Sequence, residues 1–477
     1  MNYDAVIIGA GCSGMSAALI LARQGLRVAL VEKQAKVGPL LRRFRRGNVW
    51  CDGGFHYSGG LLPGGSLDVL LRYLGIGERV RAVPMSQDGF DILTFDRREP
   101  IRIPWGMERF KETLAESFPR SRRAAEAYVE RVAGVIHSTP FISFDMDLEQ
   151  VARSQYSRES LHEFLQRVEA DEEMERVLGG YGDTLYGASA AEIPMDIHAM
   201  VMGSFFHSAH TLERGGDSLV DAFEAGLAGR GVDVYGGRAA AKIRLGARRR
   251  VEGVELEGGD LLECRACIST IHPQLLGGLL GDAAPARRLL DEIAVLENTF
   301  APFVVFLDIE QTPPGLVDSN TYYFADREGA GAGKQSLFVE CCGTTPGAGE
   351  KTALCMVCPC RPEPGEDYES FKQRQSGQIL RQTIEMFPAL RGRCKVAVAA
   401  TPRTYEALTG TVGGAIYGLK HSVRQKALDA HSGIGGLYLA GQSILASGVM
   451  GSIISGFLAA SHLVNIQTLW SELQQCR

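Results

Sequence analysis

A glycine-rich loop near the N-terminus constrains this chain more than any other feature. The loop spans residues 9–14 and reads GAGCSG. It follows a short apolar run at 5–8 that is typical of a buried parallel strand, and it precedes an Ala- and Leu-rich segment at 15–22 that predicts a helix. A second apolar run ends in Glu32. This order of strand, glycine turn, helix, strand and acid is that of a dinucleotide-binding unit.

Each part of this unit has a physical task. Gly9 permits the tight turn, Gly11 lets the backbone approach a pyrophosphate, and Gly14 lets the helix pack against the strand. The helix N-terminus offers free N–H groups and the positive end of a dipole to the phosphates. Glu32 follows the loop near the spacing of ~20 residues expected for an acid that binds the ribose hydroxyls. The cofactor-binding residues expected here are Gly9, Gly11, Cys12, Ser13, Gly14, Glu32 and Lys33.

Length and composition bound the class of protein. A chain of 477 residues is long enough for about two or three domains. Hydrophobic and charged fractions of 45% and 22% are typical of a soluble globular protein. The net charge of −6 is small for this length and argues against nucleic acid as a partner. No secretory signal is visible before the first strand, so we expect a cytoplasmic protein.

The eleven cysteines raise the question of a metal site. One C-x-x-C pair occupies 264–267, and a second group, which includes Cys341 and Cys342, extends over 341–360. The two groups are much farther apart than the ligand pairs of a zinc ribbon, and both lie in or beside expected buried strands. We therefore predict buried structural thiols and no metal ion.

Glycines recur where the backbone is expected to approach a flat ligand. Gly38 and the basic run at 42–46 follow the acid, and these arginines fit a phosphate, a substrate carboxylate or anionic lipid as well as a solvated loop. The turn at 51–60 sets four glycines around His56 and Tyr57. Near the C-terminus, a strand at 436–440 ends at a glycine, and a helix is expected to begin near Gly448.

The apolar stretch at 443–464 is long enough to suggest a membrane span. It contains three glycines and several serines, however, and it follows a strand and a turn directly. A buried helix of the nucleotide-binding domain is the stronger interpretation. Two other segments, 83–204 and 289–400, carry no glycine-loop motif and predict an inserted substrate domain.

These blocks together resemble the flavin-dependent amine-oxidase-like superfamily, and within it the phytoene desaturase, carotenoid isomerase and retinol saturase group. Two details favour the retinol saturase branch. One is the His56–Tyr57 pair, where desaturases more often carry a proline after the second glycine of that turn, and the other is Gln442, where many relatives have an acid. The match is weak in the substrate-domain segments. The matching blocks are 9–14 with Glu32, 52–57, 215–219, 401–405 with 414–418, and 437–451.

The resemblance implies an α/β fold with a discontinuous, Rossmann-like FAD-binding domain and an inserted α+β substrate domain. The first covers 1–82, 205–288 and 401–477, and the second covers 83–204 and 289–400. The resemblance also implies non-covalent FAD and hydride exchange with flavin N5. The further cofactor-binding residues expected from it are Gly38, Arg42, Gly54, Phe55, His56, Ala241, Gly441, Gln442, Gly448, Val449 and Gly451.

The substrate that the resemblance implies is a long apolar polyene, similar to a carotenoid or retinoid, on which the enzyme acts as saturase, desaturase or isomerase. Reduction of a polyene also needs a proton. Candidate donors are His56, Tyr57, Tyr405 and Tyr417. Because such a substrate is collected from lipid, we expect peripheral membrane contact. The oligomeric state stays open.

Two other functions remain as alternatives. An amine or amino-acid oxidase would share the fold but need a polar, charge-lined pocket. A prenyl-lipid carrier of the GDP-dissociation-inhibitor type would share the architecture and bind no flavin. The glycines at 441, 448 and 451 favour a bound flavin over the carrier.

Overall fold

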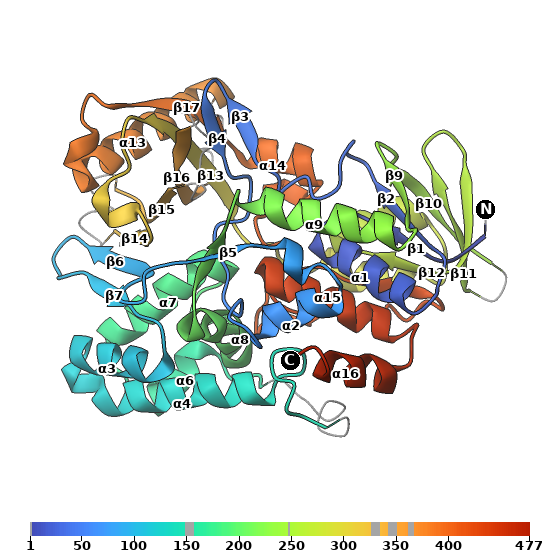
Figure 1. Ribbon diagram of the computed structural model, residues 1–477, viewed down its shortest axis with the longest axis horizontal. Coiled ribbons are helices and arrows are strands. Elements are labelled where there is room, and N and C mark those ends of the chain that lie inside the picture. Colours follow the sequence, from blue (N-terminus) through green and yellow to red (C-terminus); the bar gives the residue numbers. More distant parts are fainter. Residues whose placement is uncertain (1, 148–156, 247–248, 326–333, 342–350, 361–366) are drawn as a thin grey trace.

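Two β-sheets organise the molecule, and helices pack around both of them (Figure 1). The computed structural model describes residues 2–147, 157–246, 249–325, 334–341, 351–360 and 367–477. Cys342 of the sequence analysis lies outside these residues.

The first sheet has the N-terminal strand β1 near its centre, in parallel pairing with β2 on one side and β12 on the other. Strands β9 and β18 extend the parallel part, and β10 and β11 add an antiparallel part. The parallel strands come from distant segments of the chain. Because they run in the same direction, their carboxyl ends share one edge of the sheet. The strands are β1 (Asn2–Ile8), β2 (Val28–Glu32), β9 (Asp233–Gly236), β10 (Ala240–Leu245), β11 (Val251–Leu256), β12 (Leu261–Ser269) and β18 (Leu437–Leu439).

Helices α1 (Cys12–Arg23) and α15 (Gly448–Ser461) lie side by side against this sheet (Figure 1). They approach closely because a side chain is missing at their contact, where a Cβ on Gly456 would lie 2.6 Å from the Ser13 carbonyl oxygen. Most residues of α15 are buried, which confirms the prediction of a buried helix. Among the described residues, no helix combines the length and apolarity needed to cross a bilayer.

The second sheet joins strands from both segments assigned to the substrate domain, because β6 pairs in parallel with β14. Strand β4 belongs to 1–82 but pairs with β16 of this sheet, so the sheet crosses the predicted division. The strands are β3 (Phe44–Arg46), β4 (Val49–Cys51), β6 (Asp91–Phe95), β7 (Ile101–Ile103), β13 (Ala301–Ile309), β14 (Asn320–Phe324), β15 (Leu337–Cys341), β16 (Lys351–Cys360) and β17 (Cys394–Ala400); β5 (Ala82–Pro84) and β8 (His210–Leu212) form a separate pair.

A group of helices packs below β6 and β7 in Figure 1. Local sequence sets the ends of these helices. Asp171 precedes the first residue of α7 and its side chain caps the Met174 N–H, and Gly187, in the left-handed region, follows the last residue. The group is α3 (Met107–Ser117), α4 (Arg122–Ser138), α6 (Leu161–Arg167), α7 (Glu172–Tyr186) and α8 (Met195–His207).

The other helices connect or cover the two sheets. Helix α9 runs across the first sheet beside α1 (Figure 1). These helices are α2 (Ser66–Tyr73), α9 (Gly216–Gly229), α10 (Leu276–Leu280), α11 (Arg287–Ala294), α13 (Tyr368–Met386), α14 (Pro402–Thr409) and α16 (Ile466–Gln474). The predicted α/β fold, with its strand, glycine turn, helix and second strand, is confirmed.

The cysteine groups fall in different sheets, because 264–267 lies in β12 and 355–360 lies in β16. Both groups are buried, and burial raises the pKa of the Cys264 thiol to about 11 and that of Cys360 to about 12. The two groups therefore do not combine into one ligand set.

Candidate active site

A cavity of about 440 Å³ lies at the carboxyl edge of the first sheet. We call it the large cavity, because its lining draws on more of the described residues than that of either other hollow. Gly9, Glu32, Thr270 and Gly441, which end or follow β1, β2, β12 and β18, all line it. Open α/β sheets bind ligands at this edge, and the volume is within the usual ~300–1,000 Å³ of ligand sites.

Glu32 is fixed at one end of the large cavity by the backbone. Its Oε2 accepts a hydrogen bond from the Ala10 N–H at 2.8 Å, and its Oε1 accepts one from the Gln34 N–H at 2.9 Å. The side chain is only 6% exposed. Each carboxylate oxygen keeps further acceptor capacity, so Glu32 can also accept from the hydroxyls of a ribose.

Two helix starts face the same cavity and fit the anionic and flat parts of FAD. The first turns of α1 and α15 have no side-chain cap, so their N–H groups are available to a ligand. A Cβ built on Gly11 or Gly448 would meet no protein atom within 4 Å. These residues therefore leave room for a cofactor, whereas Gly14 fills a packing role, because its Cβ would lie 1.9 Å from the Gly9 carbonyl oxygen.

Most residues predicted to bind the cofactor line the large cavity. They are Gly9, Gly11, Cys12, Ser13, Glu32, Lys33, Gly38, Gly54, His56, Gly441, Gln442, Gly448 and Val449. The side chain of Gln442 also donates to the Ile416 carbonyl oxygen at 3.1 Å, so part of its hydrogen-bonding capacity stays within the protein.

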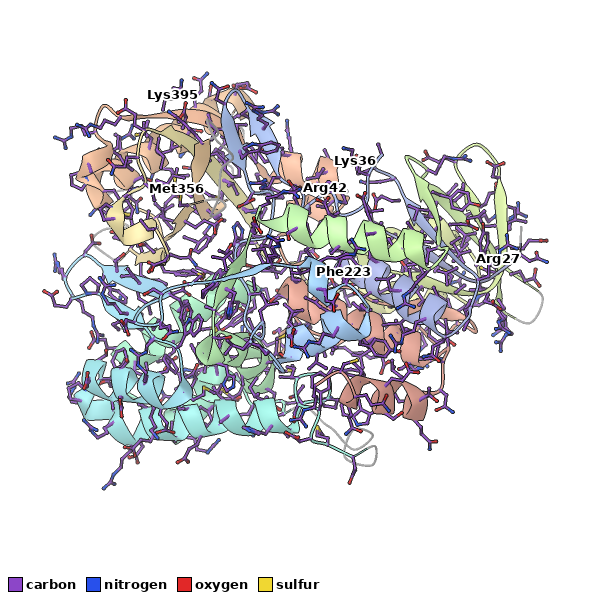
Figure 2. The ribbon with its side chains drawn as sticks, in the orientation of Figure 1. Arg27, Lys36, Arg42, Phe223, Met356 and Lys395 are labelled. Carbon is purple, nitrogen blue, oxygen red and sulfur yellow. The ribbon has the colours of Figure 1, made fainter. Side chains whose placement is uncertain are left out.

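The structure places two predicted residues away from the cavity. The Arg42 guanidinium lies beside α9 (Figure 2), where it pairs with Glu224 at 2.6 Å and Asp221 at 3.6 Å. Two acids of α9 therefore hold the cation that sequence reasoning assigned to the cofactor. Ala241 is exposed, and its neighbour Ala240 lines the cavity instead, because successive residues of a strand point to opposite faces.

A smaller hollow of about 120 Å³, the apolar chamber, adjoins the large cavity. The predicted residues Phe55, Tyr57 and Gly451 line the chamber but not the large cavity. Its other side chains are mainly aliphatic or aromatic, and apart from His56 no titrating cation or carboxylate is among the described lining residues. The residues shared by the two hollows are Gly54, His56, Tyr417, Gly448 and Val449.

His56 stands at this junction and is paired with Glu340 of β15. The ring Nδ1 hydrogen-bonds the Glu340 carboxylate, which is 5% exposed. Burial lowers the pKa of His56, but the charge and hydrogen bond of Glu340, with Asp52 behind them, raise it more, so the net pKa lies above the ordinary value. Sequence reasoning missed Glu340, because only the pairing of distant strands brings it to the turn.

Asp52 is a second buried carboxyl beside this pair. It is 3% exposed, and its Oδ1 has no hydrogen-bond partner among the described residues. Burial and the Glu340 charge raise the pKa of Asp52 to about 7, against the opposing charges of Arg43 and His56. The imidazole at the junction is therefore paired with Glu340, and a second buried carboxyl acts on it through its charge.

The tyrosine candidates have hydroxyls bonded within the protein. Tyr57 donates to Asp91 Oδ2 at 2.6 Å, and Tyr417 donates to the Thr184 carbonyl oxygen at 2.8 Å. Asp91 also accepts from Tyr181 and from the Asn320 amide. Burial raises the pKa of Asp91 to about 7, although these hydrogen bonds lower it.

His56, Glu340 and Cys355 are side chains of metal-ligand type, and their ligand atoms lie within 4.8 Å of one another. Glu340 and Cys355 face each other across β15 and β16. The hydrogen bond between His56 and Glu340 already uses the imidazole nitrogen of this group. The expectation of no metal stays a prediction.

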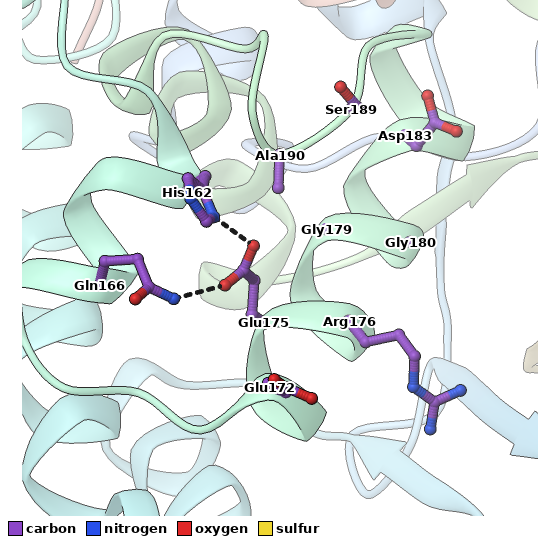
Figure 3. A pocket seen from close by; sticks show the side chains of 10 residues that line it. All are labelled: His162, Gln166, Glu172, Glu175, Arg176, Gly179, Gly180, Asp183, Ser189 and Ala190. Carbon is purple, nitrogen blue, oxygen red and sulfur yellow. Dashed lines mark hydrogen bonds and ion pairs between the residues drawn. The ribbon is translucent and has the colours of Figure 1, made fainter.

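A third hollow of about 500 Å³, the polar pocket, lies on the helical group and shares no lining residue with the other two (Figure 3). In it, His162 Nδ1 pairs with Glu175 at 2.5 Å, and Gln166 donates to the same carboxylate at 3.1 Å. It contains a His–Glu pair away from the candidate active site.

The chain belongs to the family of flavin-containing amine oxidoreductases, whose family model matches residues 12–464. It is a FAD-dependent oxidoreductase. Among curated proteins it is 24% identical to the all-trans-retinol 13,14-reductase of Macaca fascicularis, over 99% of this chain and 87% of the relative. It is also 24% identical to the hydroxyneurosporene desaturase of Rubrivivax gelatinosus, over 97% of this chain and 93% of that protein.

Solved structures give the same fold. A putrescine oxidase aligns over 97% of this chain and 99% of its own, with a TM-score of 0.66 and 15% identity. The predicted membership of the amine-oxidase-like superfamily, with retinol saturase and desaturase relatives, and the prediction of FAD are therefore confirmed.

Some lining residues were missed although the sequence carried a signal for them. Thr270 and His272 follow the buried strand β12, and the rule that ligands lie at the carboxyl ends of parallel strands would have found both. The Thr409 to Thr411 turn after α14 also lines the large cavity. No local pattern marks it.

Proposed function

We propose that this enzyme uses FAD to transfer hydrogen at a carbon–carbon double bond of a long, apolar, conjugated substrate. The observation that carries the proposal is the apolar chamber, which joins the large cavity at His56 and Tyr417. A chamber whose described lining has no carboxylate and, apart from His56 at the junction, no titrating cation favours a hydrocarbon over a charged substrate. The retinol reductases and the carotenoid desaturase among the relatives support the same class.

The chain's own residues supply binding, orientation and exclusion of water. When bound, FAD supplies the exchange of a hydride with the substrate. Glu32 and the starts of α1 and α15 would hold the cofactor, with Gly11 and Gly448 giving the space for it. Side chains such as Leu185 and Phe205 keep the chamber dry beside it.

The alternative of an amine oxidase is less well supported, because that reaction needs a site that binds a charged amine, and the chamber lacks acidic side chains among its described residues. The putrescine oxidase likeness, at 15% identity, concerns the fold. The prenyl-lipid carrier is also less well supported, because the family whose model matches this chain is described as flavin-containing.

The experiment is anaerobic reduction of the purified flavoprotein, followed by mixing with a panel of polyenes that begins with all-trans-retinol. The proposal predicts that a polyene restores the oxidised flavin spectrum and is recovered with two added hydrogens, or that the oxidised enzyme removes two from a related polyene. Reoxidation by none of the polyenes, together with peroxide formation from aerobic amines, would contradict it.

Peripheral contact with a membrane is part of this proposal, since a polyene dissolves in lipid rather than in water. Flotation with liposomes of neutral and of anionic composition measures this contact directly. Absence of binding to both, combined with turnover of a water-soluble substrate, would remove this part of the proposal.

A further inference from the structure

The imidazole of His56 is held at Nδ1 and against one ring edge, and its backbone carbonyl is anchored separately. Glu340 binds Nδ1, the Phe338 ring packs edge-on at 5.3 Å between centroids, and the Thr211 hydroxyl donates to the His56 carbonyl oxygen at 3.2 Å. No hydrogen bond to Nε2 is present among the described residues, although His56 lines both hollows. Nε2 is therefore the ring atom left for a ligand.

The charges around this ring favour the imidazolium form. Glu340 faces it from β15 and Asp52 from its own turn, with Cys355 of β16 close to the same carboxylate. Arg43 and Asp217 lie behind Asp52 rather than against the ring. A cation hydrogen-bonded to one buried carboxylate, with a second carboxyl nearby, is stabilised relative to the neutral ring, so a proton is stored at this position.

Two of the other candidate donors, Tyr57 and Tyr417, do not match this arrangement. Tyr57 donates to Asp91, and Tyr417 donates to a backbone carbonyl. Burial raises the pKa of both hydroxyls far above the ordinary value, which makes each a weaker acid than an imidazolium.

We infer that His56 donates the proton in a reductive reaction and that Glu340 is the positioning residue that orients and charges it. The inference rests on the proposed function. In the step, one carbon of the double bond accepts a hydride from reduced FAD, which is the reductant. The neighbouring carbon takes the Nε2 proton: the N–H bond breaks, a C–H bond forms, and the imidazole is left neutral. The carbon–carbon π bond is lost.

The same arrangement holds the proton that the reductive direction consumes. An imidazolium at the junction is ready to donate a proton, whereas desaturation would start from the neutral ring as a base. The Glu340 and Asp52 carboxyl groups disfavour the neutral ring. The resting pair is therefore in the form that protonates a substrate.

The first experiment measures His56 directly in the oxidised, FAD-loaded enzyme labelled with carbon-13 histidine. His56→Gln identifies the signal by its loss. Glu340→Gln keeps the size of the side chain and removes its charge, so we expect the His56 pKa to fall by at least about one unit. Glu175→Gln is the matched control, because it removes the same charge from the His162 pair of the polar pocket (Figure 3).

The second experiment follows reoxidation of the reduced enzyme by all-trans-retinol as a function of pH. In the wild type, the rate falls as pH rises through the His56 pKa measured by NMR. Glu340→Gln moves this alkaline limb to lower pH by the same interval, and Glu175→Gln leaves it in place. His56→Gln slows the step by about 10² or more. Reoxidation by ferricyanide, which needs no proton at carbon, does not fall in parallel with reoxidation by retinol in His56→Gln or Glu340→Gln, and Glu175→Gln leaves both rates at the wild-type value.

Three outcomes would overturn the inference. The first is a rate of reoxidation by retinol whose alkaline limb lies at the same pH in the wild type and in Glu340→Gln. The second is reoxidation of His56→Gln by retinol at the wild-type rate. Stoichiometric metal in the purified enzyme, lost in Glu340→Gln, would assign the pair to an ion instead. The proposed function fails separately, if no polyene reoxidises the wild type. A wild-type flavin spectrum and melting temperature in Glu340→Gln establish that the variant is folded.

Discussion

The two ends of the candidate active site are built in different ways. The end at Glu32 is made by backbone: strand ends, two helix starts, and glycines that leave space. The end at His56 is made by side chains from the turn at 51–60, from β15 and from the helical group. The first arrangement anchors a cofactor whatever the reaction is. The second arrangement would select the substrate and, as proposed, hold a proton on His56.

The largest effect is expected from Gly14→Ala at the anchoring end. Its Cβ would lie 1.9 Å from the Gly9 carbonyl oxygen, so the strand, turn and helix must shift. We expect unfolding free energy to fall by about 3 kcal/mol, measured by urea denaturation of the flavin-free protein. Gly11→Ala is the control in the same loop, since its Cβ meets no atom. It should weaken FAD binding and change stability by no more than about 1 kcal/mol. Equal destabilisation by both would contradict this division.

Glu32→Gln tests the ribose end of the cofactor site. The amide group turns an N–H donor toward one of the two backbone N–H groups that Glu32 now accepts from, so the flavin-free protein loses some stability. The ribose hydroxyls also lose a charge-assisted hydrogen bond to the carboxylate, which is worth about 1.5–3 kcal/mol, so FAD affinity should fall roughly 10- to 100-fold. Flavin fluorescence titration measures it. An unchanged affinity would mean that the ribose does not lie at Glu32.

Asp91→Asn tests the polar network behind the reacting end. The buried carboxyl accepts from Tyr57, Tyr181 and Asn320, so its loss should cost about 2 kcal/mol at about pH 5. The pKa of Asp91 is about 7 in the folded protein and ~3.9 when unfolded. The folded state therefore binds more protons between these values, and the wild type loses this stabilisation as pH rises.

The stability deficit of Asp91→Asn should thus be smaller at about pH 8 than at about pH 5, as measured by urea denaturation at both values. A deficit that grows with pH would show that Asp91 is stabilised as an anion. FAD affinity should not change, because Asp91 lies outside the large cavity lining.

The smallest effect is expected from Arg42→Ala. Its guanidinium pairs with two half-exposed acids of α9, and such pairs contribute about 0.5–1 kcal/mol. Thermal unfolding should reveal this modest loss, and isothermal titration should show unchanged FAD binding. A tenfold loss of FAD affinity would restore the role that the sequence suggested for Arg42.

The same contrast explains how far the sequence could lead. Strand, turn and helix signals are local, so the βαβ unit and most of the large cavity followed from residues 9–14, Glu32 and the C-terminal glycines. The partner of His56 could not be predicted, because Glu340 lies on a strand with no motif and reaches the turn only through the second sheet. Arg42 shows a related limit: a basic run does not reveal which acids of α9 will pair with it, and its contact with the cofactor stays a prediction.

The most direct measurement compares reoxidation by all-trans-retinol in reduced Glu32→Gln and His56→Gln, both saturated with FAD. If one end anchors and the other reacts, Glu32→Gln reoxidises at close to the wild-type rate once FAD is bound. His56→Gln, likewise saturated with FAD, reoxidises about 10² more slowly. A Glu32→Gln enzyme that is equally slow with FAD bound, or a His56→Gln enzyme at full speed, would contradict the account.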